Sequence, residues 1–315
     1  MLSRRLAGLA GTRYYRNFGS GTFGRVYKGK ITRPGNYKGA KIVAVKRIEL
    51  GAVTNQETWE KKIDRLRQLP TLVHDNIVPC HLVRITKNIG KTTVEIMMEL
   101  CESDLACCLK KATHSSTGHE TYRYDDVERY CKEITAGVDL LHQRNIIHGD
   151  LKPANILTKD LPNGRKRLLI GDLEDLVHMQ ESVTCSGDIT QLHGTFSYMS
   201  PEMLKKFSMI RTESPGRKTD VWCLGCIMLE IAERCLGSKT DKKLLQKNGE
   251  QITVDDSVSM SRYTILIIDG YVPFVSADIP RKLAACIQLC LKPAPNQRVT
   301  AGMLLDKLSL ADIIP

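Results

Sequence analysis

The sequence lacks the long apolar run that a membrane-spanning helix requires. Such a helix needs roughly 20 consecutive apolar residues, and the best candidate, Val221 to Leu229, ends at Glu230. No internal repeat or low-complexity segment is evident either. A chain of 315 residues with 42% hydrophobic residues can form one large domain or two lobes with buried cores. We therefore expect a globular protein that does not span a membrane.

Acidic residues are scarce in the N-terminal part, and none precedes Glu49. Residues 1–100 contain 19 Lys and Arg against 7 Asp and Glu, a net charge of +12, whereas residues 101–315 contain 27 against 28, a net charge of −1. A basic region could attract nucleic acid, phospholipid or a polyphosphate nucleotide. A solvated basic face explains most of these side chains more simply. Because no nucleic-acid motif accompanies the charge, we expect no specific nucleic-acid binding.

The cysteines show no disulfide framework. The chain has 11, an odd number, with no secretory signal, so we expect reduced thiols and a cytoplasmic or nuclear protein. Cys223 and Cys226 form a single CxxC within an apolar helical run, where buried core thiols are a simpler interpretation than a zinc or redox site. The acid-free start, MLSRRLAGLAG, faintly suggests a transit peptide. A short leader over residues 1–13 is the simpler interpretation.

The first hundred residues are predicted to be mostly β-strand. RVYKGKI (25–31) and KIVAVKRIEL (41–50) are rich in β-branched residues, and the turn-rich TRPGNYKGA (32–40) separates them. One helix is expected over residues 56–69, with Trp59, Ile63 and Leu66 as its apolar stripe and Pro70 as its stop. Residues 92–100 form a further expected strand.

After about residue 103 the pattern changes to helices. The stretches with helical character are 124–144, 219–237, 281–291 and 300–310. Short strands are expected within 155–172, with Asn163-Gly164 as a hairpin turn. The predicted fold class is α+β, with a small β-rich lobe, a short hinge near 99–104 and a larger α-rich lobe.

A glycine-rich stretch, GSGTFGRV, covers Gly19 to Val26. Strand-like sequence follows it, which argues against a dinucleotide-binding βαβ unit, where a helix would follow. Glycines let a hairpin backbone approach phosphates closely, although the motif alone also fits a surface hairpin. Lys46 of VAVK comes next in the chain and is then a candidate phosphate ligand.

The stretch HGDLKPAN contains a second group of chemistry-bearing residues. Asp150 could accept a proton from a substrate hydroxyl, and Lys152 could neutralise a phosphoryl group in transit. Asn155 and Asp172 offer oxygen ligands suited to Mg²⁺. Each of these residues alone is more often structural. Their order along the chain is the strong signal.

The chain resembles eukaryotic-type protein kinases of the serine/threonine branch over roughly Tyr14 to Leu308. The resemblance rests on GSGTFGRV, VAVK, HGDLKPAN, the acid of GDLE, GTFSYMSPE, TDVWCLGCIMLE and NQRVTAGMLL. It implies a leader over 1–13, a kinase domain over 14–308 and a tail over 309–315. Within the domain, the N-lobe would cover about 14–98, the hinge 99–104 and the C-lobe 105–308.

The resemblance also implies roles for individual residues, with ATP and Mg²⁺ (or Mn²⁺) as cofactors. Lys46 would hold the α and β phosphates, Asp150 and Lys152 would serve the acceptor hydroxyl, and Asn155 and Asp172 would bind the metal. The nucleotide would also contact Gly19, Ser20, Gly21, Thr22, Phe23, Gly24, Val26, Ala44, Met98, Glu99, Cys101 and Leu157. The supporting residues would be Thr195 beside Asp150, Asp220 as an anchor of the catalytic loop, Glu202 with Arg298 as a buried ion pair, and Glu60 as the partner of Lys46.

The substrate class follows from the same motifs. The Lys-Pro of DLKPAN and the threonine of GTFSYMSPE resemble the serine/threonine branch, so the expected partner is a protein with a Ser or Thr acceptor. Ala154 stands where many kinases that prefer basic substrates have an acid, so an arginine-directed preference is not supported. The oligomeric state stays open. Ser182, Thr184, Ser186 and Thr190 are candidate phosphosites in the expected activation segment, 172–202.

Three positions depart from the family pattern. Gly149 replaces the arginine that normally pairs with a phosphate on the activation segment, so we expect activity without phosphorylation there. Glu174 replaces the glycine of Asp-Phe-Gly, which could alter the metal site, lock the segment or leave it unaffected. A helix alignment puts Arg65 in the slot of the glutamate that pairs with Lys46, while Glu60, our preference, or Asp64 could serve instead.

The leading hypothesis is an active protein kinase. All four residues nearest the chemistry, Lys46, Asp150, Asn155 and Asp172, are present, and phosphoryl transfer needs positioning and charge neutralisation above all. The alternative is a pseudokinase that binds nucleotide weakly and acts as a scaffold or regulator, which Glu174 and the unassigned helix acid favour. Nucleotide binding without transfer would separate the two.

Overall fold

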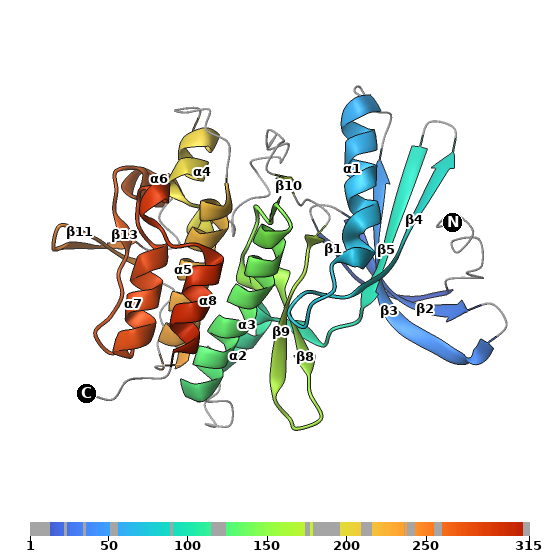
Figure 1. Cartoon of the computed structure of the whole chain (residues 1–315), viewed down its shortest axis with the longest axis horizontal. Helices are drawn as coiled ribbons and strands as arrows, with labels where there is room; N and C mark the ends of the chain where they lie inside the picture. The colour runs from blue at the N-terminus through green and yellow to red at the C-terminus, as the bar shows by residue number, and fades with distance from the viewer. Residues whose placement is uncertain are drawn as a thin grey trace. The chain divides into compact units, whose positions relative to one another are not determined.

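The chain folds into two compact units, Met1–Glu102 and Ser103–Pro315, in the computed structural model. The structure describes residues 13–21, 24–33, 36–50, 56–88, 91–114, 124–173, 177–178, 196–208, 216–235, 237, 243–254 and 260–310. Figure 1 shows that strands dominate the first unit and helices the second. The predicted α+β class is confirmed.

The first unit is built on a five-stranded antiparallel sheet in the order β1-β2-β3-β5-β4. Its strands are β1 (Arg13–Gly21), β2 (Gly24–Arg33), β3 (Asn36–Leu50), β4 (Cys80–Asn88) and β5 (Lys91–Glu99). The predicted turn over 32–40 is too long, because β3 already begins at Asn36 and this residue pairs with Arg33 of β2. The ladder thus extends over residues 36–40, which the turn-like composition of this stretch had hidden.

Helix α1 (Gln56–Gln68) and the 3₁₀ turn η1 (Leu69–Thr71) interrupt the strands of this unit. Ile63 and Leu66 are buried, as the apolar stripe predicts. The side chain of Trp59 lies outside the described part of the structure. Pro70 sits inside η1, where its missing N–H ends the α-helical pattern.

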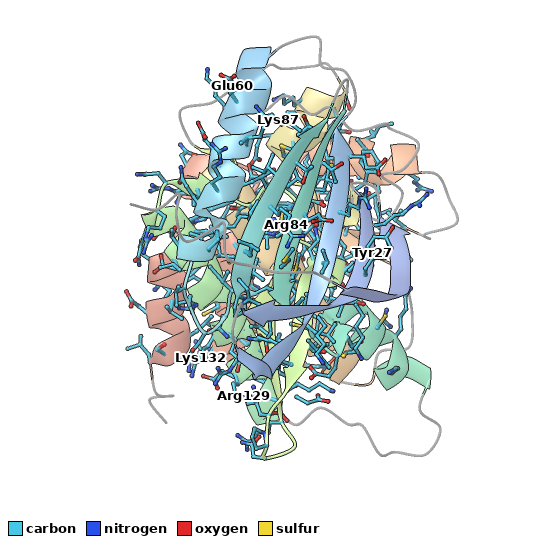
Figure 2. All side chains as sticks on the ribbon, turned by 90° about the vertical axis from the view of Figure 1, so that its right-hand side faces the viewer. Tyr27, Glu60, Arg84, Lys87, Arg129 and Lys132 are labelled. Atoms are coloured by element: carbon cyan, nitrogen blue, oxygen red, sulfur yellow. The ribbon has the colours of Figure 1, made fainter. Side chains whose placement is uncertain are left out.

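The two faces of the sheet differ in character. Val43, Val45, Met97 and Leu82 form one buried cluster, and Tyr27 packs against it. Figure 2 shows Tyr27 on β2 and Arg84 on β4. Because strand side chains alternate, Ala44 and Lys46 point to the opposite face. That second face carries the candidate nucleotide residues described below.

The second unit is a helical core with α5 at its centre. Its helices are α2 (Leu105–His114), α3 (Tyr124–Gln143), α4 (Pro201–Phe207), α5 (Arg217–Cys235), α6 (Met260–Ile268), α7 (Arg281–Cys290) and α8 (Ala301–Ser309). Residues 221–229 of α5 are all buried, as expected for a helix that is apolar on nearly every face. Gly225 allows α7 to pack closely, because a Cβ there would lie 2.7 Å from Cys290 Cβ.

Short strands carry the catalytic motifs of this unit. They are β6 (Ser103–Asp104), β7 (Ile146–Ile147), β8 (Ile156–Asp160), β9 (Lys166–Ile170) and β10 (Val177–His178), with the 3₁₀ turn η2 (Pro153–Asn155). The edge of β9 is capped by α3: Arg129 donates to Lys166 O at 2.7 Å, and Leu168 N donates to Glu133 at 2.7 Å. Figure 2 shows Arg129 and Lys132 on this helix.

A third small sheet was not predicted from the sequence. Its order is β12-β11-β13, with β11 (Lys243–Lys247), β12 (Glu250–Val254) and β13 (Val272–Pro273). Asn248 and Gly249 join the first two strands with φ values of 51° and 86°. This pair of positive φ values is typical of the tight Asn-Gly hairpin turn.

The nine cysteines whose side chains the structure describes are free thiols. Burial raises the pKa of Cys223 well above its ordinary value and that of Cys226 to about 12. These two residues are therefore core thiols, and the described residues contain no cluster of three His, Cys, Asp or Glu side chains able to hold a metal. Among the same residues, no helix has the length and apolar composition needed to cross a membrane.

Candidate active site

The segment 146–157 alternates buried apolar anchors with polar side chains. Ile147 and Leu151 are almost fully buried, which fixes the backbone on both sides of Asp150. The 3₁₀ turn η2 then directs Asn155 back towards Asp150. The apolar residues thus hold a short loop whose polar groups converge.

Asp150 is the centre of this convergence. Lys152 Nζ lies 2.7 Å from Asp150 Oδ2, and Asn155 Nδ2 donates to the same oxygen at 3.1 Å and to the backbone oxygen of Asp150 at 2.8 Å. The Asp150 side chain is 30% exposed. One carboxylate oxygen is therefore held by two donors, while the group stays accessible to solvent.

Asp220 of α5 holds the backbone of the loop that precedes Asp150. Its carboxylate accepts hydrogen bonds from the backbone N–H groups of His148 and Gly149, each at 2.9 Å. His142 Nε2 lies 2.9 Å from the same carboxylate. Burial would raise the pKa of Asp220, but the hydrogen bond and charge of His142 outweigh it and lower the pKa below its ordinary value. Sequence reasoning missed His142, because nothing local marks a contact with a helix so distant in the chain.

Asp172 is held beside Asn155 by the backbone of the preceding residue. Gly171 N donates to Asn155 O at 2.8 Å, and His148 Nε2 lies 2.9 Å from Gly171 O. Asp172 has a φ of 58°, a left-handed conformation that is uncommon outside glycine and is often found at functional sites. Leu173 is buried, whereas Glu174 lies outside the described residues.

Glu202 and Arg298 form an ion pair at the base of the second unit. Arg298 donates to both carboxylate oxygens, at 2.7 and 2.8 Å, and its side chain is fully buried. Its other N–H groups donate to the backbone oxygens of Lys292, Lys218 and Pro293. Burial would raise the pKa of Glu202, but the hydrogen bonds and charge of Arg298 dominate and lower it.

Candidate nucleotide residues of the first unit lie beside one another on three neighbouring strands, β2, β3 and β5. Lys46 on β3 is paired with Val26 on β2 and Ile96 on β5, and Ala44 is paired with Met98. Lys46 is 9% exposed. A lysine buried to that extent is normally paired with other groups.

The glycine-rich stretch forms the closed end of the β1–β2 hairpin. Gly19 is paired with Val26, and Gly21 is paired with Gly24. Thr22 and Phe23 lie outside the described residues, as do Thr195 and the four candidate phosphosites. The two strands of the predicted hairpin are therefore paired as far as Gly21 and Gly24.

Glu99 and Cys101 follow at the end of β5. Glu99 N donates to Pro79 O at 2.9 Å, and the carbonyl oxygen of Glu99 accepts a weak hydrogen bond from Cys101 Sγ at 4.0 Å. The Glu99 side chain lies 2.7 Å from Lys41 Nζ and 3.2 Å from His81 Nε2.

The helix acid that would partner Lys46 stays a prediction. Asp64 is exposed and pairs with Arg67 at 3.0 Å, and Arg65 Nε donates to Lys61 O at 3.3 Å. Glu60 lies on the exposed surface of α1 in the described structure, and Figure 2 shows it on this helix.

The comparisons with known proteins assign the family. The protein kinase domain matches residues 13–308, so the chain belongs to the protein kinase family. Mitogen-activated protein kinase kinase kinase 4 of Mus musculus is 24% identical over 91% of this chain and 16% of its own length. CBL-interacting serine/threonine-protein kinase 5 of Arabidopsis thaliana is 32% identical over 70% of this chain and 44% of its own length. The chain thus spans less than half of these relatives.

Proposed function

We propose that the protein transfers the γ-phosphoryl group of ATP to serine or threonine hydroxyls of a protein substrate. The observation that carries this proposal is the Asp150 carboxylate, which Lys152 and Asn155 hold on one oxygen. Kinase relatives at 24% and 32% identity support the reaction class. The serine/threonine branch is supported by the Lys-Pro of HGDLKPAN and by the names of several relatives.

In this proposal Asp150 acts as the proton acceptor. Lys152 and Asn155 both contact Oδ2, so Oδ1 is the oxygen that receives the substrate hydroxyl. A carboxylate held this way orients the hydroxyl and accepts its proton as the new P–O bond forms and the bond from the γ-phosphorus to the bridging oxygen breaks, which releases ADP. Lys152, already next to Asp150, neutralises charge on the phosphoryl group in transit.

Asn155 and Asp172 fit a divalent cation. The amide nitrogen of Asn155 is used by Asp150, which leaves its oxygen as a ligand, and Gly171 holds Asp172 beside it. Hard oxygen donors suit Mg²⁺, which takes few protein ligands when substrate phosphates supply the others. We assign Mg²⁺ to these two residues, with Mn²⁺ as a substitute. Bound there, it would shield the phosphate charge.

The nucleotide contacts follow the residues of the first unit. Lys46 holds the α and β phosphates, while Val26 and Ala44 lie against adenine. The carbonyl oxygen of Glu99, whose own N–H is already used by Pro79, accepts a hydrogen bond from the adenine edge. Cys101 supplies the complementary backbone donor.

The test is transfer of labelled phosphate from ATP to a mixed Ser/Thr protein substrate, with nucleotide binding measured on the same preparation. We expect transfer with Mg²⁺, and phosphoserine or phosphothreonine in the hydrolysed product. Nucleotide binding without transfer, with either Mg²⁺ or Mn²⁺, would instead support a pseudokinase scaffold. Phosphotyrosine alone would contradict the Ser/Thr assignment.

A further inference from the structure

The unpredicted sheet places a lysine on the segment that follows Thr195. Lys243, the first residue of β11, holds its Nζ 5.5 Å from the centroid of the Tyr198 ring. Tyr198 belongs to the 3₁₀ turn η5 (Phe196–Tyr198). A cation over an aromatic face is attracted by the negative potential of the ring. Two segments far apart in the sequence therefore meet at this lysine.

Tyr198 is hydrogen-bonded to the neighbouring acid, Glu230. Its hydroxyl donates to Glu230 Oε2 at 2.5 Å, and burial together with the Glu230 charge raises the Tyr198 pKa well above its ordinary value. Burial likewise raises the pKa of Glu233, against the opposing charge of Lys243. Of these two acids, Glu230 is thus hydrogen-bonded to a tyrosine, and Glu233 is half-buried. The ammonium group of Lys243, by contrast, has no hydrogen bond or ion pair with the side chains and backbone groups that the structure describes.

This lysine lies near the catalytic loop. Cys223 Sγ donates to Tyr198 O at 3.1 Å, and Asp220, about one helical turn earlier on α5, accepts from the backbone N–H groups of His148 and Gly149, each at 2.9 Å. Tyr263 also fixes the turn, because its hydroxyl donates to Ser197 O at 3.0 Å. Because α5 contacts both η5 and the loop that contains Asp150, we expect a peptide whose hydroxyl reaches Asp150 to pass close to η5 and its lysine.

The same sheet contains a second lysine with matching geometry in a different place. Lys247 Nζ lies 5.5 Å from the centroid of the Tyr271 ring, and Tyr271 donates to Glu250 at 2.8 Å. Lys247 also donates to Asp269 O at 2.6 Å, so its ammonium group is used within the sheet and its own loop. The pair at 243 and 198 differs because it joins the sheet to η5.

We propose that Lys243 is a specificity-determining residue, which favours acceptor peptides with an acidic side chain near the phosphorylated hydroxyl and disfavours those with a basic one. The proposal rests on the proposed function, since it places the acceptor at Asp150. Among the described residues the ammonium group of Lys243 has no hydrogen bond or ion pair, while Glu230 accepts a hydrogen bond from Tyr198. At peptide positions that face it, this ammonium group attracts a carboxylate and repels an ammonium or guanidinium group.

The test uses synthetic serine peptides on an alanine-glycine background, with one Glu or one Arg at each position within four residues of the acceptor. Turnover gives kcat and KM, and fluorescence anisotropy gives Kd for the same peptides with the serine replaced by alanine. The proteins are the wild type, Lys243→Met, Lys243→Glu and the matched control Lys247→Met. Thermal unfolding of each variant shows that the fold is retained.

We expect the wild type to prefer Glu over Arg at one or more positions, through KM and Kd more than kcat. Lys243→Met should reduce that ratio by about threefold to fivefold, the size of a single partly exposed charge pair. Lys243→Glu should reverse the preference, and Lys247→Met should keep it. Equal ratios in the wild type and Lys243→Met, or no peptide binding at all, would overturn the proposal.

The two proposals can fail separately. Charge-selective peptide binding that depends on Lys243, but without phosphoryl transfer, would support the surface and contradict the proposed enzyme. Transfer with no preference between Glu and Arg peptides would keep the enzyme and overturn the role of Lys243.

Discussion

Asn155 donates its side-chain amide to both the backbone oxygen and the carboxylate of Asp150, at 2.8 and 3.1 Å. The side chain of Asn155 can therefore serve two roles: its amide nitrogen positions Asp150, and its amide oxygen is the proposed ligand of a cation. Asp150 is thereby held in one orientation before any substrate arrives. Preorganised groups of this kind need no rearrangement in the transition state.

Replacing Asn155 should therefore affect both the rate and the metal requirement. We expect Asn155→Ala to reduce kcat by about 10²-fold, the lower end for loss of effective acid–base catalysis, and to raise the Mg²⁺ concentration for half-maximal activity. Steady-state kinetics over a Mg²⁺ titration measures both. Asn163→Ala, in the exposed turn between β8 and β9, is the control and should match the wild type. A normal Mg²⁺ dependence in Asn155→Ala would contradict the metal assignment.

Gly149 concerns the control of activity by phosphorylation of the expected activation segment. It stands where an arginine would bind a phosphate on the activation segment, and glycine has no side chain for that contact. We therefore expect phosphatase treatment to leave the phosphoryl-transfer rate unchanged. A large loss of activity after treatment, restored by rephosphorylation, would show that another residue reads the phosphate.

A matched pair of variants separates the effect of an arginine at position 149 on activity from the backbone strain that the substitution causes. Gly149 and Gly164 have φ values of 78° and 76°, and a Cβ at either would meet nothing within 4 Å. Arginine at each position should then cost about 1–2 kcal/mol of stability through the left-handed conformation. We expect Gly149→Arg to lower activity and Gly164→Arg to preserve it. A phosphatase-sensitive gain of activity in Gly149→Arg would contradict this expectation.

The pair of Arg298 and Glu202 should dominate the stability of the second unit. Arg298→Met leaves a buried carboxylate without its cation, a change that typically costs about 3 to 5 kcal/mol. It also removes the cation 5.0 Å from the ring centroid of Trp222. Urea unfolding measures the loss. Arg67→Met, which breaks an exposed pair with Asp64, is the control and should cost less than about 1 kcal/mol.

The same pair predicts how stability depends on pH. The pKa of Glu202 in the folded protein lies below its ordinary value of 4.5, so the unfolded chain binds the proton more readily. The stabilisation is therefore fully present above pH 4.5 and is lost as the pH falls through the folded pKa.

Glu202→Gln removes this titration. We expect its free energy of unfolding to be lower than that of the wild type but to fall less steeply below pH 4.5. Denaturant unfolding at a series of pH values measures the slope. Asp160→Asn, in an exposed pair with Lys166, should keep the wild-type slope. An unchanged slope in Glu202→Gln would show that other carboxylates control the acid transition.

Much of the site could be predicted because its parts are local. Asp150, Lys152 and Asn155 lie within one short stretch, and their order is legible in the sequence. The central helix was equally readable, because residues 221–229 are apolar on every face. Patterns that depend only on neighbouring residues carry this much information.

Contacts between distant segments were not predictable from such patterns. The contact of His142 with Asp220 joins α3 to α5, and that of Lys243 with Tyr198 joins β11 to η5. Strand β4 and the β11–β12–β13 sheet were not predicted. Their short sequences contain polar residues that break the strand pattern, and they are recognised as strands only through pairing with other segments. The start of β3 at Asn36 was missed because a Pro-Gly signal marks a turn without giving its length.

Phosphoryl transfer by the wild type and by Asp150→Asn, with Mg²⁺ and separately with Mn²⁺, tests the central claim most directly. Asp160→Asn serves as the control, since this aspartate is exposed and pairs with Lys166 of the same hairpin. We predict transfer by the wild type and by Asp160→Asn, and a loss of at least about 10²-fold in Asp150→Asn with nucleotide binding retained. Equal transfer by Asp150→Asn, or none by the wild type with either metal, would contradict the assignment of Asp150 as the residue that accepts the substrate proton.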